Sequence, residues 1–192
     1  MRRWVKLVLA TLAFALAVTV TGVIASYALE FEPIGPAVAP NPAEHHGAVV
    51  QIYGANVWGF RGNFAVHTWV AVKEDGARAY TLYQVIGWGL RRYGSAVSIS
   101  EGKPNRYWFR SPPKLLFEAS GDAASRMIPQ IKNAVAAYPY EQEYVMWPGP
   151  NSNSFVQWIV LSVPELEVDL PAKAIGKNWM IDNFSSSTAS PD

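Results

Sequence analysis

Apolar residues gather in short runs along the middle of the chain, separated by glycine, proline and polar residues. Such runs, rich in valine, isoleucine and aromatic residues, are typical of β-strands. They predict strands at 48–53, 64–72 and 78–86, with shorter ones at 95–100, 106–110 and 115–120. The turn at 74–76 is expected to join the second strand to the third as a hairpin.

Two later segments repeat apolar residues every three or four positions, which is the period of an amphipathic helix. The first covers 122–138 and contains Pro129, which predicts a kink there. The second covers 153–163 and ends before Pro164. Strands followed by helices predict an α+β domain in which an antiparallel sheet packs on helices.

The first 29 residues have the pattern of a membrane segment. A short basic stretch is followed by 23 residues, 7–29, without a charge. At about 1.5 Å per residue this stretch could span a bilayer. It predicts one transmembrane helix in the inner membrane, with residues 1–6 in the cytoplasm and the rest in the periplasm or exterior. A cleavable signal peptide, with Ser26 and Ala28 before the cut, is the alternative.

The remaining chain divides into three parts. Residues 30–44 are rich in proline and predict a semi-rigid spacer. One folded domain is expected at 45–180, because half of the 192 residues are hydrophobic and 13% are aromatic. Residues 181–192 predict a disordered tail.

Composition narrows the chemistry. A formal net charge of +1 and the lack of a nucleic-acid-binding motif give no reason to expect a nucleic-acid partner. The absence of cysteine excludes disulfides, thiolate metal sites and thiol catalysis. Only three histidines are present, and His45 and His46 are neighbours, so we expect no metal and no other cofactor. No pair of acidic residues suits a glycosidase mechanism.

One histidine lies within a predicted strand, among apolar residues. If Asp75 and Gly76 form a two-residue turn, the numbers of paired residues sum to about 151, and His67 faces Gln84. A glutamine there can accept the ring N–H and fix the tautomer. A register slip of one residue would place Tyr83 there instead. The alternative is an ordinary core histidine satisfied by hydrogen bonds.

A polar run, Asn151 to Ser154, opens the second predicted helix. Ser152 or Asn153 as the N-cap would be a sufficient structural explanation. The functional interpretation adds that a helix N-terminus stabilises negative charge and that its N–H groups can bind an oxyanion. Ser152 would then be a nucleophile, and it would need His67 as its general base.

The strand histidine and the later helix start together resemble the circularly permuted branch of the NlpC/P60 papain-like superfamily, which includes lecithin:retinol acyltransferase-like proteins. The usual helix motif of that branch is Asn-Cys-Glu-x-Phe, and Asn151-Ser152-Asn153-Ser154-Phe155 stands in its place. The resemblance implies a permuted papain-like fold and attack on amide or ester carbonyls of cell-wall peptides or lipids. Serine replaces the catalytic cysteine of that superfamily.

Three segments, 58–69, 147–155 and 170–176, also resemble an uncharacterised bacterial family, a DUF3750-like domain of unknown function. This resemblance extends from about residue 45 to about residue 180. It implies no activity, because nothing is established about what the family does.

A cleft is expected around His67, Gln84 and Ser152, the three residues predicted to be catalytic. The residues expected to bind substrate there are Trp58, Arg61, Trp69, Tyr83, Trp88, Asn151 and Asn153. Four tryptophans lie in or near predicted loops. They are suited to the rim of a cleft that binds sugar or lipid, and the alternative is that they fill the ends of the core. They are Trp58, Trp88, Trp108 and Trp147.

Basic residues are concentrated between positions 91 and 114, with Glu101 as the one acid among them. They could bind phosphate or an anionic glycan, or form a solvated sheet edge. They are Arg91, Arg92, Lys103, Arg106, Arg110 and Lys114.

These patterns leave three hypotheses for function. The first is a membrane-anchored hydrolase or acyltransferase that uses Ser152 and His67 on an amide or ester of an envelope peptide or lipid. The second is an inactive relative that binds an envelope peptide, glycan or lipid. The third is a structural envelope protein with a vestigial cleft.

Overall fold

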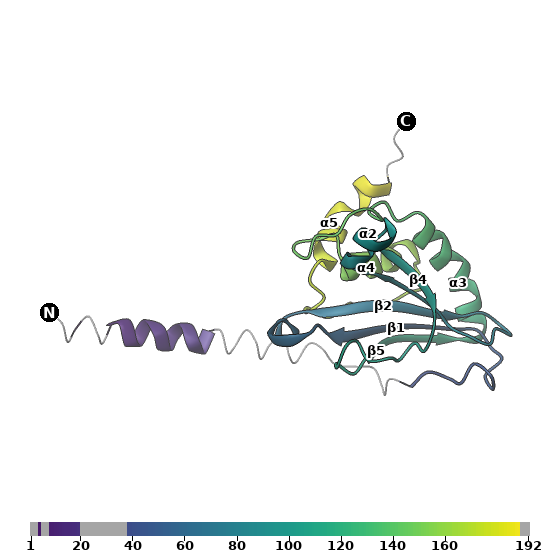
Figure 1. Ribbon diagram of the computed structural model, residues 1–192, viewed down its shortest axis with the longest axis horizontal. Coiled ribbons are helices and arrows are strands. Elements are labelled where there is room, and N and C mark those ends of the chain that lie inside the picture. The colour runs from purple at the N-terminus through teal and green to yellow at the C-terminus, as the bar shows by residue number, and fades with distance from the viewer. Residues whose placement is uncertain (1–3, 5–7, 20–37, 189–192) are drawn as a thin grey trace.

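The computed structural model describes residue 4 and residues 8–19 and 38–188. Figure 1 shows an α+β domain in which helices cover one face of a five-stranded antiparallel sheet of order β4-β3-β2-β1-β5. The strands are β1 (Val49–Asn56), β2 (Val66–Lys73), β3 (Thr81–Val85), β4 (Val97–Glu101) and β5 (Lys114–Ser120). The helices are α2 (Gly87–Tyr93), α3 (Gly121–Ala136), α4 (Ser152–Ser162), α5 (Lys177–Thr188) and the 3₁₀ helix η1 (Gly59–Asn63).

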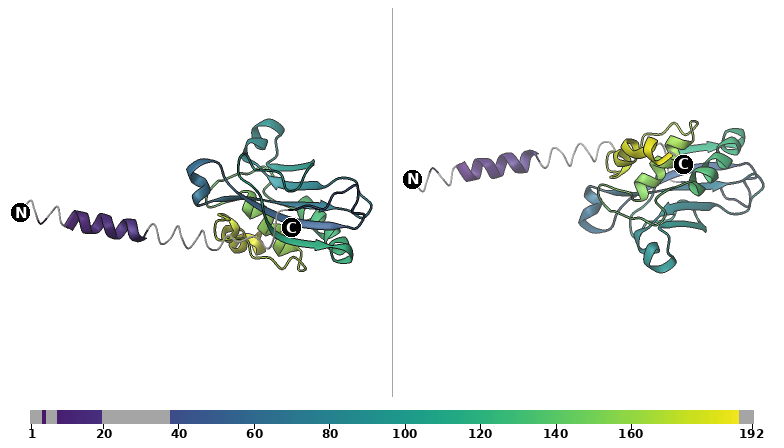
Figure 2. Two further views of the ribbon diagram at one scale, coloured as in Figure 1. Left: turned by 90° about the horizontal axis from the view of Figure 1, so that it is seen from below. Right: turned by 90° about the horizontal axis from the view of Figure 1, so that it is seen from above.

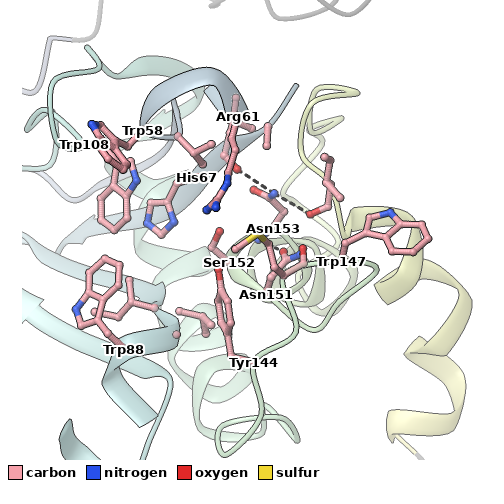
Figure 3. A pocket seen from close by; sticks show the side chains of 18 of the residues that line it. Trp58, Arg61, His67, Trp88, Trp108, Tyr144, Trp147, Asn151, Ser152 and Asn153 are labelled. Atoms are coloured by element: carbon pink, nitrogen blue, oxygen red, sulfur yellow. Dashed lines mark hydrogen bonds between the residues drawn. The ribbon is translucent and has the colours of Figure 1, made fainter. Parts of the chain in front are cut away.

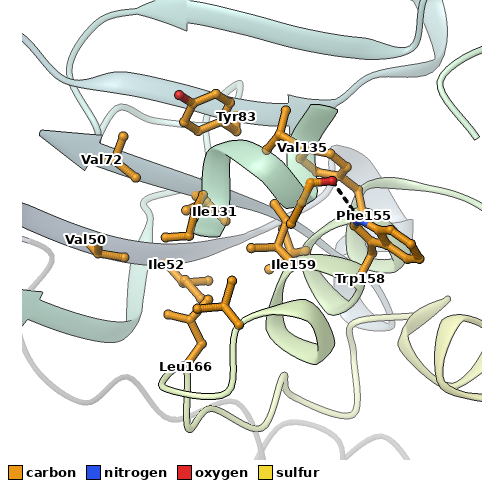
Figure 4. Packing of buried hydrophobic residues seen from close by; sticks show 14 of the residues in the cluster. Val50, Ile52, Val72, Tyr83, Ile131, Val135, Phe155, Trp158, Ile159 and Leu166 are labelled. Atoms are coloured by element: carbon orange, nitrogen blue, oxygen red, sulfur yellow. Dashed lines mark hydrogen bonds between the residues drawn. The ribbon is translucent and has the colours of Figure 1, made fainter. Parts of the chain in front are cut away.

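The main core lies between the sheet and helices α3 and α4. Successive strand residues point to opposite faces, so Ile52 of β1 and Val70 of β2 face the helices. They pack in one cluster with Ile131 of α3 and with Phe155 and Ile159 of α4 (Figure 4). Helix α3 lies between this core and solvent, so its apolar residues face the sheet and its polar residues face outward.

The second face of the sheet carries a smaller cluster. It contains Tyr53, Trp69 and Leu82, and Ala39 packs against it. The Tyr80 hydroxyl donates to the Pro40 carbonyl at 3.0 Å. The described end of the expected spacer therefore lies against the sheet, while the helices cover the opposite face (Figures 1 and 2).

The hairpin between β2 and β3 differs from the predicted one. Ala71 pairs with Leu82, so paired numbers sum to 153 and residues 74–80 form a longer connection. Lys73 is fully buried, and its ammonium donates to the carbonyls of His46, Gly47 and Glu74. These contacts hold the end of β2 against residues 46–47. The predicted tight turn at Asp75 and Gly76 did not include them.

Other segments also differ from expectation. Residues 106–110 form no strand and contribute only a bridge between Trp108 and Ser111. Pro129 lies inside α3 without ending it. Residues 181–188, expected to belong to a disordered tail, are helical in α5. Packing against α4 explains this helix, because Met180 is fully buried and the Phe184 ring contacts Trp158 of α4.

The described helical residues 8–19 contribute to neither core. Residues 8–19 are helical and exposed, and the residues of both hydrophobic clusters lie between Ala39 and Phe184. A fragment of residues 38–192 therefore keeps every described residue of both clusters and is expected to fold alone. No helix within the described ranges is long and apolar enough to cross a membrane. Residues 7 and 20–29 of the expected span lie outside those ranges, so the anchor stays a prediction.

Replacing Ile159 by alanine tests the packing of α4 on the sheet. Ile159 is fully buried, so the fragment 38–192 should lose about 2–5 kcal/mol in the free energy of unfolding, from lost burial and a cavity. Ile181→Ala is the matched control, because Ile181 is 49% exposed and should cost under about 1 kcal/mol. Urea unfolding measures both values. Equal losses for the two variants would contradict this packing.

Candidate functional site

The site forms where β2 extends beyond its neighbour. Strand β3 pairs with β2 only over Val70 to Val72, so residues 66–69 of β2 have no ladder partner on that side. The chain turns from β3 into α2 at this point. A cavity of about 680 Å³ opens here, bordered by η1, α2, the loop at 108–109, residues 144–147 and the start of α4 (Figure 3).

His67 lies on β2 and borders this cavity. Its Nε2 is 3.1 Å from Oε1 of Gln84. An amide oxygen only accepts hydrogen bonds, so Nε2 carries the proton and Nδ1 keeps its lone pair. Nδ1 has no hydrogen-bond partner within the described chain. Gln84 thus contacts His67 and lies on the same face of the sheet, as predicted. The pairing of β2 with β3, however, is shifted by two residues from the predicted register.

Aromatic rings hold the imidazole in place. Trp108 stacks on His67 with ring centroids 3.6 Å apart and an interplanar angle of 11°. Trp69 lies farther away, at 5.8 Å. Burial lowers the pKa of His67 to about 4, the hydrogen bond with Gln84 opposes this shift, and the charge of Arg106 adds to it. The side chain is therefore neutral at pH 7 and can accept a proton.

Helix α4 begins at Ser152, and its N-cap is Asn151. The Asn151 side chain accepts from the backbone N–H groups of Asn153 at 2.9 Å and Ser154 at 3.3 Å. The prediction of Ser152 or Asn153 as the N-cap is therefore wrong by one or two residues. Asn151 fits because its side chain reaches the second and third N–H groups of the helix, which have no acceptor within the helix.

Ser152 is the first residue of this helix, and it borders the cavity. Among the residues that the structure places, its hydroxyl and its backbone N–H have no hydrogen-bond partner. Its backbone carbonyl accepts from the Thr68 hydroxyl at 3.4 Å. Ser152 at the start of α4 and His67 on β2 both line this cavity (Figure 3).

Asn153 attaches the start of α4 to β2. Its amide nitrogen donates to the carbonyls of Val66 at 3.0 Å and Ile175 at 2.9 Å. Its oxygen accepts from the Thr68 hydroxyl at 3.0 Å. Although Asn153 borders the cavity as expected, its polar atoms are occupied by the protein. It is therefore better suited to positioning Ser152 than to binding a substrate.

Residues 175 and 176 close the same corner. The Ser154 hydroxyl donates to the Gly176 carbonyl at 2.9 Å. Gly176 has a φ of +103°, and a Cβ there would lie 2.4 Å from the Asn151 amide nitrogen. Only glycine fits this close approach. Of the four polar residues that open α4, Ser152 is thus the one with a free side chain.

The remaining predicted binding residues fall into two groups. Trp58, Arg61, Trp88 and Asn151 border the cavity. Trp69 and Tyr83 do not. Trp69 is buried in the smaller core with its indole N–H donated to the Pro104 carbonyl at 2.9 Å, and Tyr83 packs in the helix-side core. Tyr83 lies where β3 pairs with both β2 and β4, and the Trp69 ring stacks on Tyr53 within the smaller core.

Some cavity residues were missed from the sequence. Phe64, Phe109, Tyr144 and Met146 also border it. Their signal is weak, because they come from four separate loop positions without a common motif. The four tryptophans near predicted loops gave the stronger signal, and all of them, Trp58, Trp88, Trp108 and Trp147, line the cavity.

Comparison with known proteins identifies the family. The model of a family described as "Protein of unknown function (DUF3750)" matches residues 47–179. The chain belongs to the DUF3750 family. The match covers every residue that lines the cavity, so the cavity is part of the DUF3750 domain itself. No curated protein and no solved structure matches the chain.

The cavity of the DUF3750 domain has an unusual charge pattern. Among the described residues, Arg61 and Arg91 line it, and no aspartate or glutamate does. Arg61 extends into the cavity toward the region of His67 and Ser152 (Figure 3). In the part of the chain that the structure describes, no three histidine, aspartate or glutamate side chains are grouped to hold a metal. The chemistry available from these residues is proton transfer, nucleophilic attack and anion binding.

The low pKa of His67 predicts a pH dependence of stability. Folding lowers this pKa from about 6.5 to about 4, so the unfolded chain binds the extra proton first. The stability from neutral His67 is full above about pH 6.5 and is lost as the pH falls toward 4. Relative to His67→Gln, the wild-type fragment should lose about 3 kcal/mol between pH 7 and pH 4. Urea unfolding at each pH measures the difference, and a constant difference would contradict the burial of a neutral imidazole.

Proposed function

We propose that the DUF3750 domain is an acyl hydrolase or acyltransferase, with Ser152 as nucleophile, His67 as general base and Gln84 as the residue that orients the base. One observation carries the proposal. A neutral histidine with a free Nδ1 and a serine with a free hydroxyl at a helix N-terminus line one cavity. The substrate would be an amide or ester of a cell-envelope peptide or lipid, as the predicted export of the domain suggests.

In this mechanism the Ser152 Oγ attacks the carbonyl carbon while Nδ1 of His67 takes the hydroxyl proton. The backbone N–H of Ser152 and the N-terminus of α4 stabilise the oxyanion of the tetrahedral intermediate. The imidazolium then donates its proton to the leaving alcohol or amine, leaving an acyl-serine. Water or a second alcohol attacks this ester by the same route in reverse and frees Ser152.

Gln84 orients this base but only partly offsets the effect of burial on its pKa. As a neutral amide it fixes the tautomer through its hydrogen bond with Nε2, but it adds no negative charge. The imidazolium formed during reaction is therefore less stabilised than it would be beside a carboxylate. We accordingly expect slow turnover, with orientation by Trp108 and Gln84 contributing more than basicity.

The arrangement supports a papain-like site as part of the same proposal. Its parts are a strand histidine, an amide partner for its ring and a nucleophile at the start of a helix across the cavity. The serine changes the requirement, because a helix N-terminus alone does not ionise a hydroxyl as it can a thiol. The histidine must remove the proton during attack.

A second candidate is ligand binding without catalysis. The observation in its favour is the wide aromatic lining, together with the lack of an acidic side chain among the described residues that line the cavity. In that case Ser152 would only shape the cavity. A ligand would then stabilise the wild-type domain and a Ser152→Ala variant equally.

Labelling with a fluorophosphonate separates the two candidates. The wild-type fragment 38–192 should be labelled, and Ser152→Ala should not, because the covalent bond forms at Oγ. Loss of the general base in His67→Gln should slow labelling by about 100-fold or more. Ser162→Ala is the matched control, since Ser162 lies at the far end of α4 and bonds the Trp158 carbonyl.

Intact-mass spectrometry with peptide mapping measures the labelling. Label that persists in Ser152→Ala would remove Ser152 from the mechanism. An unlabelled wild type that still binds ligand as tightly as Ser152→Ala would favour the binding candidate.

A further inference from the structure

Large apolar side chains surround the cavity mouth. The side chains of Trp58, Trp147 and Phe109 are 73%, 74% and 61% exposed, although large aromatic rings are usually buried. Exposed apolar residues gathered at one opening mark a binding surface, because isolated ones need no such explanation. A volume of about 680 Å³ is in the range of small-molecule sites. The occupant must therefore bring apolar surface of its own.

The charged side chains at the cavity are both cationic. Arg61 comes from η1 and Arg91 from α2. Neither has an acidic partner among the residues described. Two unpaired guanidinium groups beside apolar walls favour an anionic group and disfavour a cationic one.

Two separate elements each bring a tryptophan together with an arginine. Helix α2 carries Trp88 and Arg91, which are three residues apart and so share a helix face. Trp58 precedes η1, which carries Arg61. Each of these two segments therefore contributes one cation and one aromatic ring to the cavity lining.

Both elements are held close to their neighbours. A Cβ at Gly87, where α2 begins, would lie 2.7 Å from the ring of Tyr144, which also lines the cavity. A Cβ at Gly62 in η1 would lie 2.5 Å from the Val57 carbonyl. Such packing fixes the two elements before any ligand arrives, which lowers the entropic cost of binding.

The polar groups that line the cavity are poorly suited to binding a sugar. Sugar hydroxyls need several free side-chain donors and acceptors. The Asn153 amide is fully used, and the Asn151 oxygen caps α4 while its nitrogen donates to the Met146 carbonyl. Most of the other polar side-chain groups that line the cavity are donors, namely the two arginines and the indole N–H groups of the tryptophans, so few acceptors remain besides His67 and the hydroxyls of Ser152 and Tyr144.

We propose that the cavity binds a single-chain amphiphile with an anionic head group, a carboxylate or a phosphate. The hydrocarbon chain lies against the tryptophans, and Arg61 and Arg91 bind the head. This ligand class rests on the proposed function, because such a molecule would place a carbonyl near Ser152 when it is the acyl donor. Binding itself needs no reaction.

Calorimetry on the Ser152→Ala fragment 38–192 tests the ligand class without chemistry. The probes, used below their micellar concentrations, share a dodecyl chain and differ in the head: dodecyl phosphate, dodecyl maltoside and dodecyltrimethylammonium. Dodecyl phosphate should bind at least about tenfold more tightly than the maltoside, and the cation should bind weakest. Shortening the chain to decyl phosphate should weaken binding by about tenfold. Methyl phosphate should not bind measurably.

Variants then locate the head group. Arg61→Gln and Arg91→Gln should each reduce the preference for phosphate over maltoside by about fivefold or more. Arg92→Gln is the matched control, since Arg92 lies over the Tyr93 ring, does not line the cavity and should leave the preference unchanged. Thermal unfolding checks that each variant is folded.

Equal binding of all three dodecyl probes would overturn the inference, as would an unchanged preference in both cavity variants. Either result combined with normal labelling of Ser152 would leave the catalytic proposal standing. The converse, selective binding without labelling of the wild type, would keep the ligand class and reject the chemistry.

Discussion

The site depends on the side chain of Asn153. This one buried amide joins the carbonyls of Val66 and Ile175 and the hydroxyl of Thr68, so it ties the start of α4 to the strand that carries His67. Each of these groups is costly to bury without a partner, at about 1–3 kcal/mol per unsatisfied group. The contact therefore sets where Ser152 lies relative to His67, and it stabilises the fold at the same point.

Alternation along the strands explains why much of the fold could be predicted. Face follows residue parity, so the helix-side core was readable from the apolar pattern, and so were the α+β class and the approximate bounds of α3 and α4. The same alternation explains why Gln84 was correctly predicted as the partner of His67 although the predicted turn was wrong. A register shift of two residues moves Gln84 along β3 but keeps it on the face of His67. A shift of one would have exchanged it for Tyr83.

Other features depend on contacts that local sequence does not specify. The local sequence does not single out Asn151 as the N-cap of α4. Gly176 and Ile175, more than 20 residues away, position Asn151, Asn153 and Ser154 and leave only Ser152 without such a contact. The stacking of Trp108 on His67 comes from a segment with no regular structure. The buried ammonium of Lys73 likewise depends on the carbonyls of His46 and Gly47, more than 20 residues away in the sequence. Tryptophans near loops gave a usable signal because large rings that stay outside the core and gather at one opening mark a binding surface.

The central claim is that neutral His67 presents Nδ1 to the hydroxyl of Ser152. Imidazole ¹⁵N NMR of the histidine-labelled fragment 38–192, compared with Ser152→Ala, tests it most directly. The account predicts a proton on Nε2 of His67 down to a pH near 4, and an Nδ1 resonance that moves when the hydroxyl is removed. A proton on Nδ1, or an Nδ1 resonance that is the same in both proteins, would contradict it.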